Sequence, residues 1–237
     1  MLYFQTVGTG PQTAILIHGV MGSSRNLSTI AKNLVKRFPK WQVILPDLRH
    51  HGASGYFDPP NTVRACAQDI FDLNIQASMI IGHSFGGKVA LCLNELMPVK
   101  QVWVWDAEPG RVAPEQTYQT VQKLRQIKMP MPTRQAVQKA ILDLGLSREI
   151  AAWMTTNLRE ASGGLIWKFN LEVILELLDS FGSTVITPQN NTDFVKAERN
   201  AHIILKSDRV HVLKNSGHWV HIDNPEALLD IMAQSLV

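Results

Sequence analysis

The most informative part of the sequence for predicting the fold is Met79-Ile80-Ile81-Gly82-His83-Ser84-Phe85-Gly86-Gly87-Lys88-Val89-Ala90. Its first three residues are apolar and predict a buried strand, the glycines predict a sharp turn, and the residues after Gly87 begin a helix. The turn contains the pattern Gly-x-Ser-x-Gly, in which a strained backbone leaves one serine at the tip with its hydroxyl exposed. The strand-turn-helix context, more than the pattern alone, predicts that Ser84 is a nucleophile.

Short apolar runs of the same kind lie before and after this stretch. Ala14–Ile17, Val43–Leu45 and Val102–Trp105 are each followed closely by Gly, Pro or Asp, as is typical of strands buried on both faces of a parallel sheet. Between the runs, Asn26–Arg37 and Thr62–Leu73 place their apolar residues on one helical stripe. This alternation predicts an α/β fold built on a doubly wound, mostly parallel sheet with crossover helices.

The alternation stops between residues 110 and 183, where the pattern predicts three or four helices and no strand. The expected helices are Pro114–Ile127, Thr133–Leu144, Ser147–Asn157 and Leu171–Phe181, separated by prolines and glycines. A chain of 237 residues is long enough for one domain with an insertion. We therefore expect residues 1–109 and 184–237 to form the core and residues 110–183 to form a helical cap inserted in it.

The sheet pattern returns after the insertion. Arg209–Leu213 predicts a strand, and Asn224-Pro225-Glu226 predicts the start of a last helix through Leu236. Two segments compete for the strand before these. Thr192–Ala197 leaves about eleven residues to the next strand, which is close to the shortest parallel crossover, whereas Ser183–Thr187 leaves more room.

A serine nucleophile needs a base that takes its proton and an acid that orients the base. In the order serine, acid, histidine, the base follows the acid along the chain. The histidines of the last part are His202, His211, His218 and His221. His218 follows the strand expected at Arg209–Leu213, and an open α/β sheet keeps its site at the C-terminal ends of its strands. We therefore expect His218 to be the base, with His221 as its nearest rival and the others as surface or packed histidines.

Asp106 is the expected acid. It directly follows the apolar run Val102–Trp105, and a carboxylate at the end of a buried strand is rarely found without a partner or a function. A capping or structural role is the alternative for this residue. The other candidate acids are Glu198, Asp193 and Glu108.

An acyl-transfer site also needs donors for the oxyanion, usually two backbone N–H groups. The loop His18–Ser23 follows the first strong strand and offers one donor, and the residue after the nucleophile offers the other. We expect the N–H groups of Val20 and Phe85 to form the oxyanion hole, with a plain glycine-rich turn as the alternative. A phosphate cradle is not indicated, because neither GxGxxG nor GxxxxGKS/T is present.

Four motifs, in the same order over nearly the whole chain, resemble those of the α/β-hydrolase superfamily. They are His18-Gly19, Asp47–Ser54, Gly82–Lys88 and Gly217–Trp219. A narrower resemblance is to the YbfF esterase family, and it is carried by His18–Asn26, Gly86-Gly87-Lys88, Asp106, Trp167–Leu171 and Gly217–His221. The chain departs from that family at Ala197–Asn200, where the family has a Gly-Asn-Ser-like turn.

The resemblance implies an α/β-hydrolase fold and a serine esterase or thioesterase that acts on small acyl esters beneath a helical cap. In the family the acid follows the strand after the nucleophile strand, which again indicates Asp106. Arg49 and His51 match the superfamily's Asp-x-Arg-x-His-Gly segment, where we expect loop-stabilising hydrogen bonds rather than chemistry. We expect Lys88 to be a structural or surface lysine, with contact to a phosphate-bearing leaving group as the alternative.

Several apolar side chains are candidates for a substrate pocket, since such pockets are mainly apolar with a few placed polar groups. They are Met21, Trp153, Trp167, Phe169, Leu171 and Trp219. The alternative is that these residues pack the insertion against the core.

Composition and charge exclude several classes of protein. Apolar residues make up 45% and charged residues 18% of the chain, which excludes disorder. A net charge of +3 with dispersed basic residues implies no nucleic-acid partner. We find no membrane span and no signal peptide in the pattern, and expect a cytoplasmic protein. Cys66 and Cys92 lack metal-ligand spacing, so we expect buried thiols and no metal site.

We therefore expect a serine hydrolase that cleaves a small-molecule carboxylic ester or acyl thioester through an acyl-enzyme intermediate, with no cofactor. One alternative is a carbon–carbon bond hydrolase or a lyase of the same fold, of the menaquinone-pathway type. The other is a ligand-binding receptor with vestigial activity.

Overall fold

A mostly parallel sheet forms the centre of the molecule. The computed structural model describes residues 1–201, 203, 205 and 207–237, and these form a seven-stranded sheet in the order β1-β3-β2-β4-β5-β8-β9. Its strands are β1 (Phe4–Val7), β2 (Gln12–Ile17), β3 (Trp41–Pro46), β4 (Met79–His83), β5 (Gln101–Trp105), β8 (Thr192–Ala197) and β9 (Val210–Leu213). β1 pairs antiparallel with β3, and the other neighbours in the sheet pair in parallel. The predicted α/β architecture is confirmed.

The central strands carry apolar residues without alternation because both of their faces are covered. Ile15 of β2 pairs with Ile80 of β4, which pairs with Val102 of β5, and all three are fully buried. Leu16 and Ile81, one residue further along, point to the opposite face and are equally buried. Short apolar runs are therefore enough to locate these strands in the sequence.

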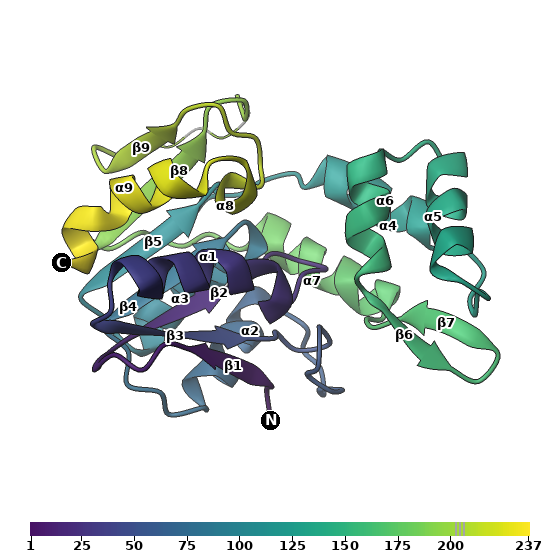
Figure 1. Cartoon of the computed structure of the whole chain (residues 1–237), viewed down its shortest axis with the longest axis horizontal. Coiled ribbons are helices and arrows are strands. Elements are labelled where there is room, and N and C mark those ends of the chain that lie inside the picture. The colour runs from purple at the N-terminus through teal and green to yellow at the C-terminus, as the bar shows by residue number, and fades with distance from the viewer. Residues whose placement is uncertain (202, 204, 206) are drawn as a thin grey trace.

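Helices cover both faces of the sheet (Figure 1). On one face, α1 (Ser24–Arg37) and α9 (Pro225–Leu236) share a core cluster with the strands. On the other face, α2 (Val63–Phe71), α3 (Phe85–Leu96) and α7 (Leu171–Ser183) form a second cluster. The short helix α8 (Val220–Asp223) precedes α9, and Pro225 begins α9 as predicted. None of the described helices has the length and apolar character needed to cross a bilayer.

The two cysteines lie in the second cluster. Cys66 of α2 and Cys92 of α3 are free and buried, as expected. Burial raises the pKa of Cys92 to about 11, so this thiol stays protonated at neutral pH.

Residues 110–183, which we call the inserted segment, connect β5 to β8. Their elements are α4 (Glu115–Leu124), α5 (Arg134–Asp143), α6 (Arg148–Thr155), β6 (Leu158–Ala161), β7 (Gly164–Trp167) and α7. In Figure 1, α4, α5, α6 and the β6–β7 hairpin lie beside the sheet, and α7 runs back toward it.

The expectation that the inserted segment contains no strand is wrong, because β6 and β7 pair as an antiparallel hairpin. Gly163 and Gly164 have φ of 87° and 134°, a backbone that favours glycine. A Cβ on Gly164 would also lie 2.5 Å from the carbonyl oxygen of Met131. Gly163 therefore lies in the turn of a hairpin whose second strand begins at Gly164, and the glycine pair does not separate two helices. Its strands have four residues each, too few to show an alternation in the sequence.

The strand next to β5 is Thr192–Ala197, and the alternative Ser183–Thr187 is wrong because α7 continues to Ser183. β8 pairs in parallel with β9, with Phe194 opposite Val210. The connection between them has no helix among its described residues. A parallel crossover this short is possible because it does not need to include a helix.

Lys88 joins both ends of the inserted segment to α3, the helix that follows Ser84. Its side chain is fully buried, and its Nζ donates to the carbonyl oxygens of Gly110 at 2.7 Å, Phe181 at 2.5 Å and Thr184 at 2.9 Å. The three N–H bonds of an ammonium group match these three acceptors. Burial lowers the pKa of Lys88 to about 8. Lys88 is therefore a structural lysine at the junction of the two parts.

Candidate active site

Ser84 stands alone between the end of β4 and the start of α3. It has φ of 55° and ψ of −120°, and its N–H donates to Trp105 O at 2.8 Å. A Cβ on Gly82 would lie 2.0 Å from Gly86 O, and one on Gly86 would lie 2.5 Å from His18 O. The two glycines of the motif are therefore required by the close approach of three backbone segments.

The structure brings Ser84, His218 and Asp106 together at the C-terminal ends of their strands. Ser84 Oγ lies 3.0 Å from His218 Nε2, and His218 Nδ1 lies 2.7 Å from Asp106 Oδ2. The side chain of Asp106 is fully buried, whereas that of His218 is 47% exposed. With Nδ1–H donating to the carboxylate, Nε2 is free to accept the proton of Ser84.

The Asp106 carboxylate is held by more than His218. Its Oδ1 accepts from Ala197 N–H at 2.9 Å, and its Oδ2 also accepts from Asn200 Nδ2 at 2.8 Å. These donors come from the end of β8 and the turn after it. Three hydrogen bonds satisfy a buried carboxylate, which would otherwise be costly to ionise. Our sequence analysis did not identify Asn200 as a site residue, although it lies where the chain departs from the family turn.

His83 holds the backbone of His218. Its Nε2–H donates to the His218 carbonyl at 2.7 Å, and the two rings lie 4.8 Å apart. Burial, followed by the charges of His218 and His221, lowers the pKa of His83 well below its usual value. Burial likewise lowers the pKa of His221 to about 4. Both histidines are therefore neutral beside His218 at neutral pH.

Phe85 directly follows Ser84, and Val20 lies in a loop that approaches Ser84 from the end of β2. A Cβ on Gly19 would lie 3.3 Å from Ser84 Cβ, so the residue before Val20 is close to the Ser84 side chain. Phe85 is the first residue of α3, whose first turn contains no acidic residue. Neither the N–H of Val20 nor that of Phe85 donates to an acceptor among the described residues. A helix N-terminus with free N–H groups favours a negative charge nearby.

Two neutral histidines stabilise the loop that carries Val20. His18 Nε2 accepts from Leu48 N–H at 3.0 Å, and its Nδ1–H donates to Gly19 O. His51 Nε2 accepts from Met21 N–H at 3.0 Å, and its Nδ1–H donates to Arg49 O at 2.8 Å. Burial lowers the pKa of His51 to about 3. This is the loop-stabilising role that the sequence predicts for His51.

Arg49 stabilises the following loop. Its guanidinium donates two hydrogen bonds to Asp69, at 2.7 Å and 2.9 Å, and others to the carbonyls of Asp58 and Pro60. A paired donor geometry of this kind is typical of arginine and carboxylate. Arg49 therefore acts on the loop and not on the serine, as predicted.

Comparison with known proteins shows which family has this fold and sequence pattern. Residues 14–231 match the family described as the alpha/beta hydrolase family. The chain belongs to this family. The sn-1-specific diacylglycerol lipase ABHD11 of Mus musculus is 27% identical over 247 residues, which cover 94% of this chain and 80% of the relative. Esterase YbfF of Escherichia coli (strain K12) is 24% identical over 234 residues, with 91% of this chain and 89% of the relative covered.

A solved structure described as a marine microorganism esterase has the same fold as this hydrolase. Its TM-score is 0.86 at 24% sequence identity, and the match covers 98% of both chains. The predicted α/β-hydrolase fold and the resemblance to the YbfF esterase are thus confirmed. The protein is an alpha/beta hydrolase with esterase-type and lipase-type relatives.

The rival residues have other partners in this hydrolase. His211 Nε2 lies 2.8 Å from Asp193 Oδ1, and that carboxylate also accepts from Arg209. Glu198 accepts from Lys214 Nζ and Asn215 N–H, both at 2.9 Å. His202 lies outside the described residues. The carboxylate bonded to His218 is that of Asp106.

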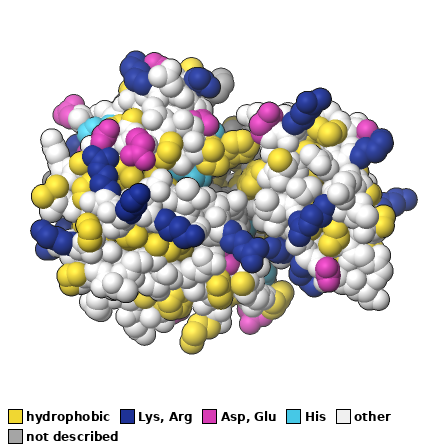
Figure 2. Space-filling model, in the orientation of Figure 1, with side chains coloured by type: hydrophobic (Ala, Val, Ile, Leu, Met, Phe, Trp, Pro, Cys, Tyr) yellow, Lys and Arg dark blue, Asp and Glu magenta, His cyan; other side chains and the backbone are white. Residues whose placement is uncertain are grey.

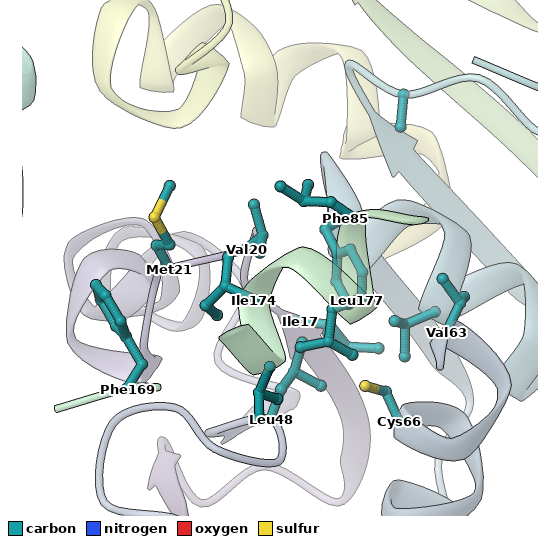
Figure 3. Packing of buried hydrophobic residues seen from close by; sticks show 14 of the residues in the cluster. Ile17, Val20, Met21, Leu48, Val63, Cys66, Phe85, Phe169, Ile174 and Leu177 are labelled. Carbon is teal, nitrogen blue, oxygen red and sulfur yellow. The ribbon is translucent and has the colours of Figure 1, made fainter. Parts of the chain in front are cut away.

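The candidate pocket residues divide into two groups. Trp153 of α6 and Trp219 beside the candidate base are partly buried, with their ring centres 5.9 Å apart in an edge-to-face arrangement. Trp167 and Phe169 are buried and stacked at 5.9 Å, and Met21 is buried as well. In Figure 3, Met21 and Val20 lie beside Phe169 and Ile174 of the inserted segment. Figure 2 shows the surface hollowed between the inserted segment and the part that contains the sheet.

The sequence analysis did not identify Asn157, and it did not predict that His83 holds the backbone of His218. Asn157 is a buried polar residue between α6 and β6, and its Nδ2 donates to Met21 O at 2.9 Å. The only sequence signal for it is an amide directly before an apolar residue at the end of a helix. Among the described residues, no group of three or more His, Cys, Asp or Glu side chains is arranged to hold a metal ion.

Proposed function

We propose that this hydrolase is a serine esterase that cleaves small carboxylic esters or acyl thioesters through an acyl-enzyme intermediate. The observation that carries the proposal is the hydrogen-bonded series from Asp106 through His218 to Ser84. A hydroxyl, an imidazole and a buried carboxylate in this order are the parts that nucleophilic acyl transfer needs. The esterase and lipase names of the two relatives support the same bond type.

In the proposed first step, Nε2 of His218 takes the proton of Ser84 while Oγ attacks the carbonyl carbon of the substrate. Asp106 keeps the imidazole oriented and stabilises its positive charge. The N–H groups of Val20 and Phe85 donate to the oxyanion that forms. The tetrahedral intermediate then collapses, and His218 protonates the leaving alcohol or thiol. The acyl group remains bonded to Ser84.

In the second step, His218 removes a proton from water, and the hydroxide attacks the acyl carbonyl. The same two N–H groups stabilise the second oxyanion. Collapse of this intermediate releases the carboxylic acid and returns the proton to Ser84. Every proton is carried by His218, so the cycle needs no cofactor.

We propose further that residues 110–183 form a cap over a core of residues 1–109 and 184–237. The three bonds from Lys88 to the ends of the inserted segment support this division. We expect the aromatic pair Trp153 and Trp219, one from each part, to contact the acyl or leaving group, and the pairing of the two rings at 5.9 Å supports this. We expect the buried residues Met21, Trp167 and Phe169 to contribute apolar surface to the same pocket. Apolar surroundings of this kind suit an acyl chain.

A fluorophosphonate probe tests the nucleophile. We expect the native protein to be labelled covalently and Ser84→Ala to remain unlabelled, as measured by intact-mass spectrometry. Equal labelling of both proteins would contradict the assignment of Ser84.

A kinetic screen of p-nitrophenyl esters and matching thioesters, over a series of acyl lengths, tests the reaction. Turnover that depends on Ser84 supports an esterase or thioesterase and defines the acyl length. Labelling of Ser84 without any ester or thioester turnover would contradict the proposal and favour the carbon–carbon bond hydrolase or lyase of the same fold.

A further inference from the structure

The carbonyl oxygen of Met21 accepts a hydrogen bond from a side chain that is 136 residues away in the sequence. The donor is Nδ2 of Asn157, at 2.9 Å, and both residues are buried. The backbone of Asn157 is itself held, because its N–H donates to Met154 O at 3.0 Å and its O accepts from Lys168 N–H at 2.8 Å. The amide that contacts Met21 is therefore fixed by the inserted segment.

Met21 occupies the third position of a tight turn. Gly22 N–H donates to Gly19 O at 3.0 Å, which closes the turn, and Met21 has φ of 57°. Type II turns have a positive φ at this position and favour glycine or asparagine there, because other side chains are strained. Relaxation to a negative φ would relieve the strain, so the bonds to Met21 are what keep the turn in this form.

Those bonds come from two different parts of the molecule. The N–H of Met21 donates to His51 Nε2 at 3.0 Å in the core, and its carbonyl accepts from Asn157 in the inserted segment. The second position of the same turn is Val20, whose N–H is a proposed oxyanion donor. Val20 N–H belongs to the peptide group directly before the one that donates to His51, so a change in the φ and ψ angles of this turn alters its direction relative to Ser84.

We propose that Asn157 is a positioning residue for the oxyanion hole, because its hydrogen bond to Met21 couples the docking of the inserted segment to the turn that presents Val20 N–H. The inference rests on the proposed esterase function. While the segment is docked, the turn has both supports and the two oxyanion donors are in place. When the segment moves away from the core, the turn loses one support. Docking of the segment and positioning of the oxyanion donors are then coupled through this hydrogen bond.

Substitution of Asn157 tests this coupling. Asn157→Leu has a similar shape but no group that can donate to Met21 O, and Asn157→Ala removes the side chain beyond Cβ. Loss of a whole oxyanion donor lowers kcat by about 10²–10³-fold. For a donor that is displaced but present we expect a smaller loss, on the order of 10- to 100-fold, with KM changed by less than about threefold. A boronic acid that forms a tetrahedral adduct with Ser84 should lose affinity by the same factor as kcat.

Ser180→Ala is the matched control. Ser180 Oγ of α7 accepts from Val63 N–H at 3.0 Å, so it also joins the inserted segment to the core, but away from the turn. We expect kcat and boronic-acid affinity within about twofold of the native protein, since this bond does not contact the oxyanion loop. Circular dichroism establishes that each variant is folded.

Amide hydrogen exchange of residues 18–24 measures the stability of the same turn and does not depend on catalytic activity. We expect faster exchange in both Asn157 variants and native-like exchange in Ser180→Ala. Native kcat, boronic-acid affinity and exchange in the Asn157 variants would overturn the inference, as would equal losses in Ser180→Ala. Absence of ester turnover in the native protein would instead overturn the proposed function, and the exchange measurement would still decide whether Asn157 holds the turn.

Discussion

At the scale of single residues, the site depends on which histidines are charged. His83 lies 4.8 Å from the ring of His218 and 4.9 Å from that of His221. Because burial lowers the pKa of His83 and of His221, neither places a positive charge beside His218 at neutral pH. Such a charge would oppose protonation of His218. The partly exposed His218 is therefore the ring best placed to take a proton from Ser84.

Asp106→Asn tests the proposed acid. The Asn side chain keeps the shape but replaces one acceptor oxygen by an NH₂ group. The carboxylate oxygens accept from Ala197, Asn200 and His218, so the NH₂ group would face at least one donor that it cannot accept from. His218 then loses the acceptor that fixes its tautomer, so we expect kcat on a p-nitrophenyl ester to fall by about 10⁴-fold.

Glu198→Gln is the control for this substitution. Its carboxylate is exposed and binds Lys214 and Asn215, so we expect near-native kcat. A large loss in Glu198→Gln together with native activity in Asp106→Asn would assign the acid to Glu198.

At the scale of elements, α3 connects Ser84 to the inserted segment. Ser84 is the residue before its first turn, and Phe85 of that turn stacks on Phe181 near the end of α7, with ring centres 5.7 Å apart. Lys88, one turn further on, binds the carbonyls at both ends of the segment. The position of the segment and the start of α3 are therefore set by the same helix.

Lys88→Met should weaken this junction. The apolar side chain fills similar space but leaves three partly buried carbonyl oxygens without their donor. The loss of one such partner costs about 1–3 kcal/mol where the acceptor is buried. We expect the free energy of unfolding, measured by urea denaturation, to fall by at least about 2 kcal/mol. Lys100→Met, at an exposed position just before β5, should change it by less than about 0.5 kcal/mol. Equal stability of the two variants would show that Lys88 does not hold the segment.

At the scale of the whole molecule, buried neutral histidines make stability depend on pH. Burial is the main cause of a lowered pKa at five positions. They are His18, His50, His51, His83 and His221. Below about pH 6.5 the unfolded chain binds protons at these positions that the folded chain does not bind. The folded state is therefore favoured above this pH and loses stability as the pH falls.

We expect the free energy of unfolding to decrease between pH 6.5 and 5 by more than about 1.4 kcal/mol per pH unit, the value for one such histidine. Urea denaturation at pH 7.5, 6.5, 5.5 and 5.0 measures this slope. In His221→Phe one titrating group is absent, and we expect a slope that is shallower by about 1.4 kcal/mol per pH unit. A stability that is constant over this range would contradict the buried neutral state of these histidines.

The central strands, the turn at Ser84 and the order of the α/β elements could all be predicted from the amino-acid sequence. These features are local: a run such as Met79–Ile81 is apolar because both faces of its strand are covered, and Gly82 and Gly86 are required by contacts within a few residues of Ser84 or with the adjacent strand end. The resemblance to known hydrolases added the expected chain order of serine, acid and histidine. The strand, turn and helix around Ser84 were enough to predict where this serine lies.

The strand that adjoins β5 and the groups that hold the site were found only in the folded molecule. Thr192–Ala197 becomes β8 because it pairs with two other strands, and no local pattern distinguished it from Ser183–Thr187. Asn200 reaches Asp106, and Asn157 reaches Met21, across 94 and 136 residues of chain. A single amide has no periodicity, and its local sequence context does not indicate which distant group it binds. Its role exists only where folding brings the carboxylate or carbonyl that it binds within hydrogen-bond distance.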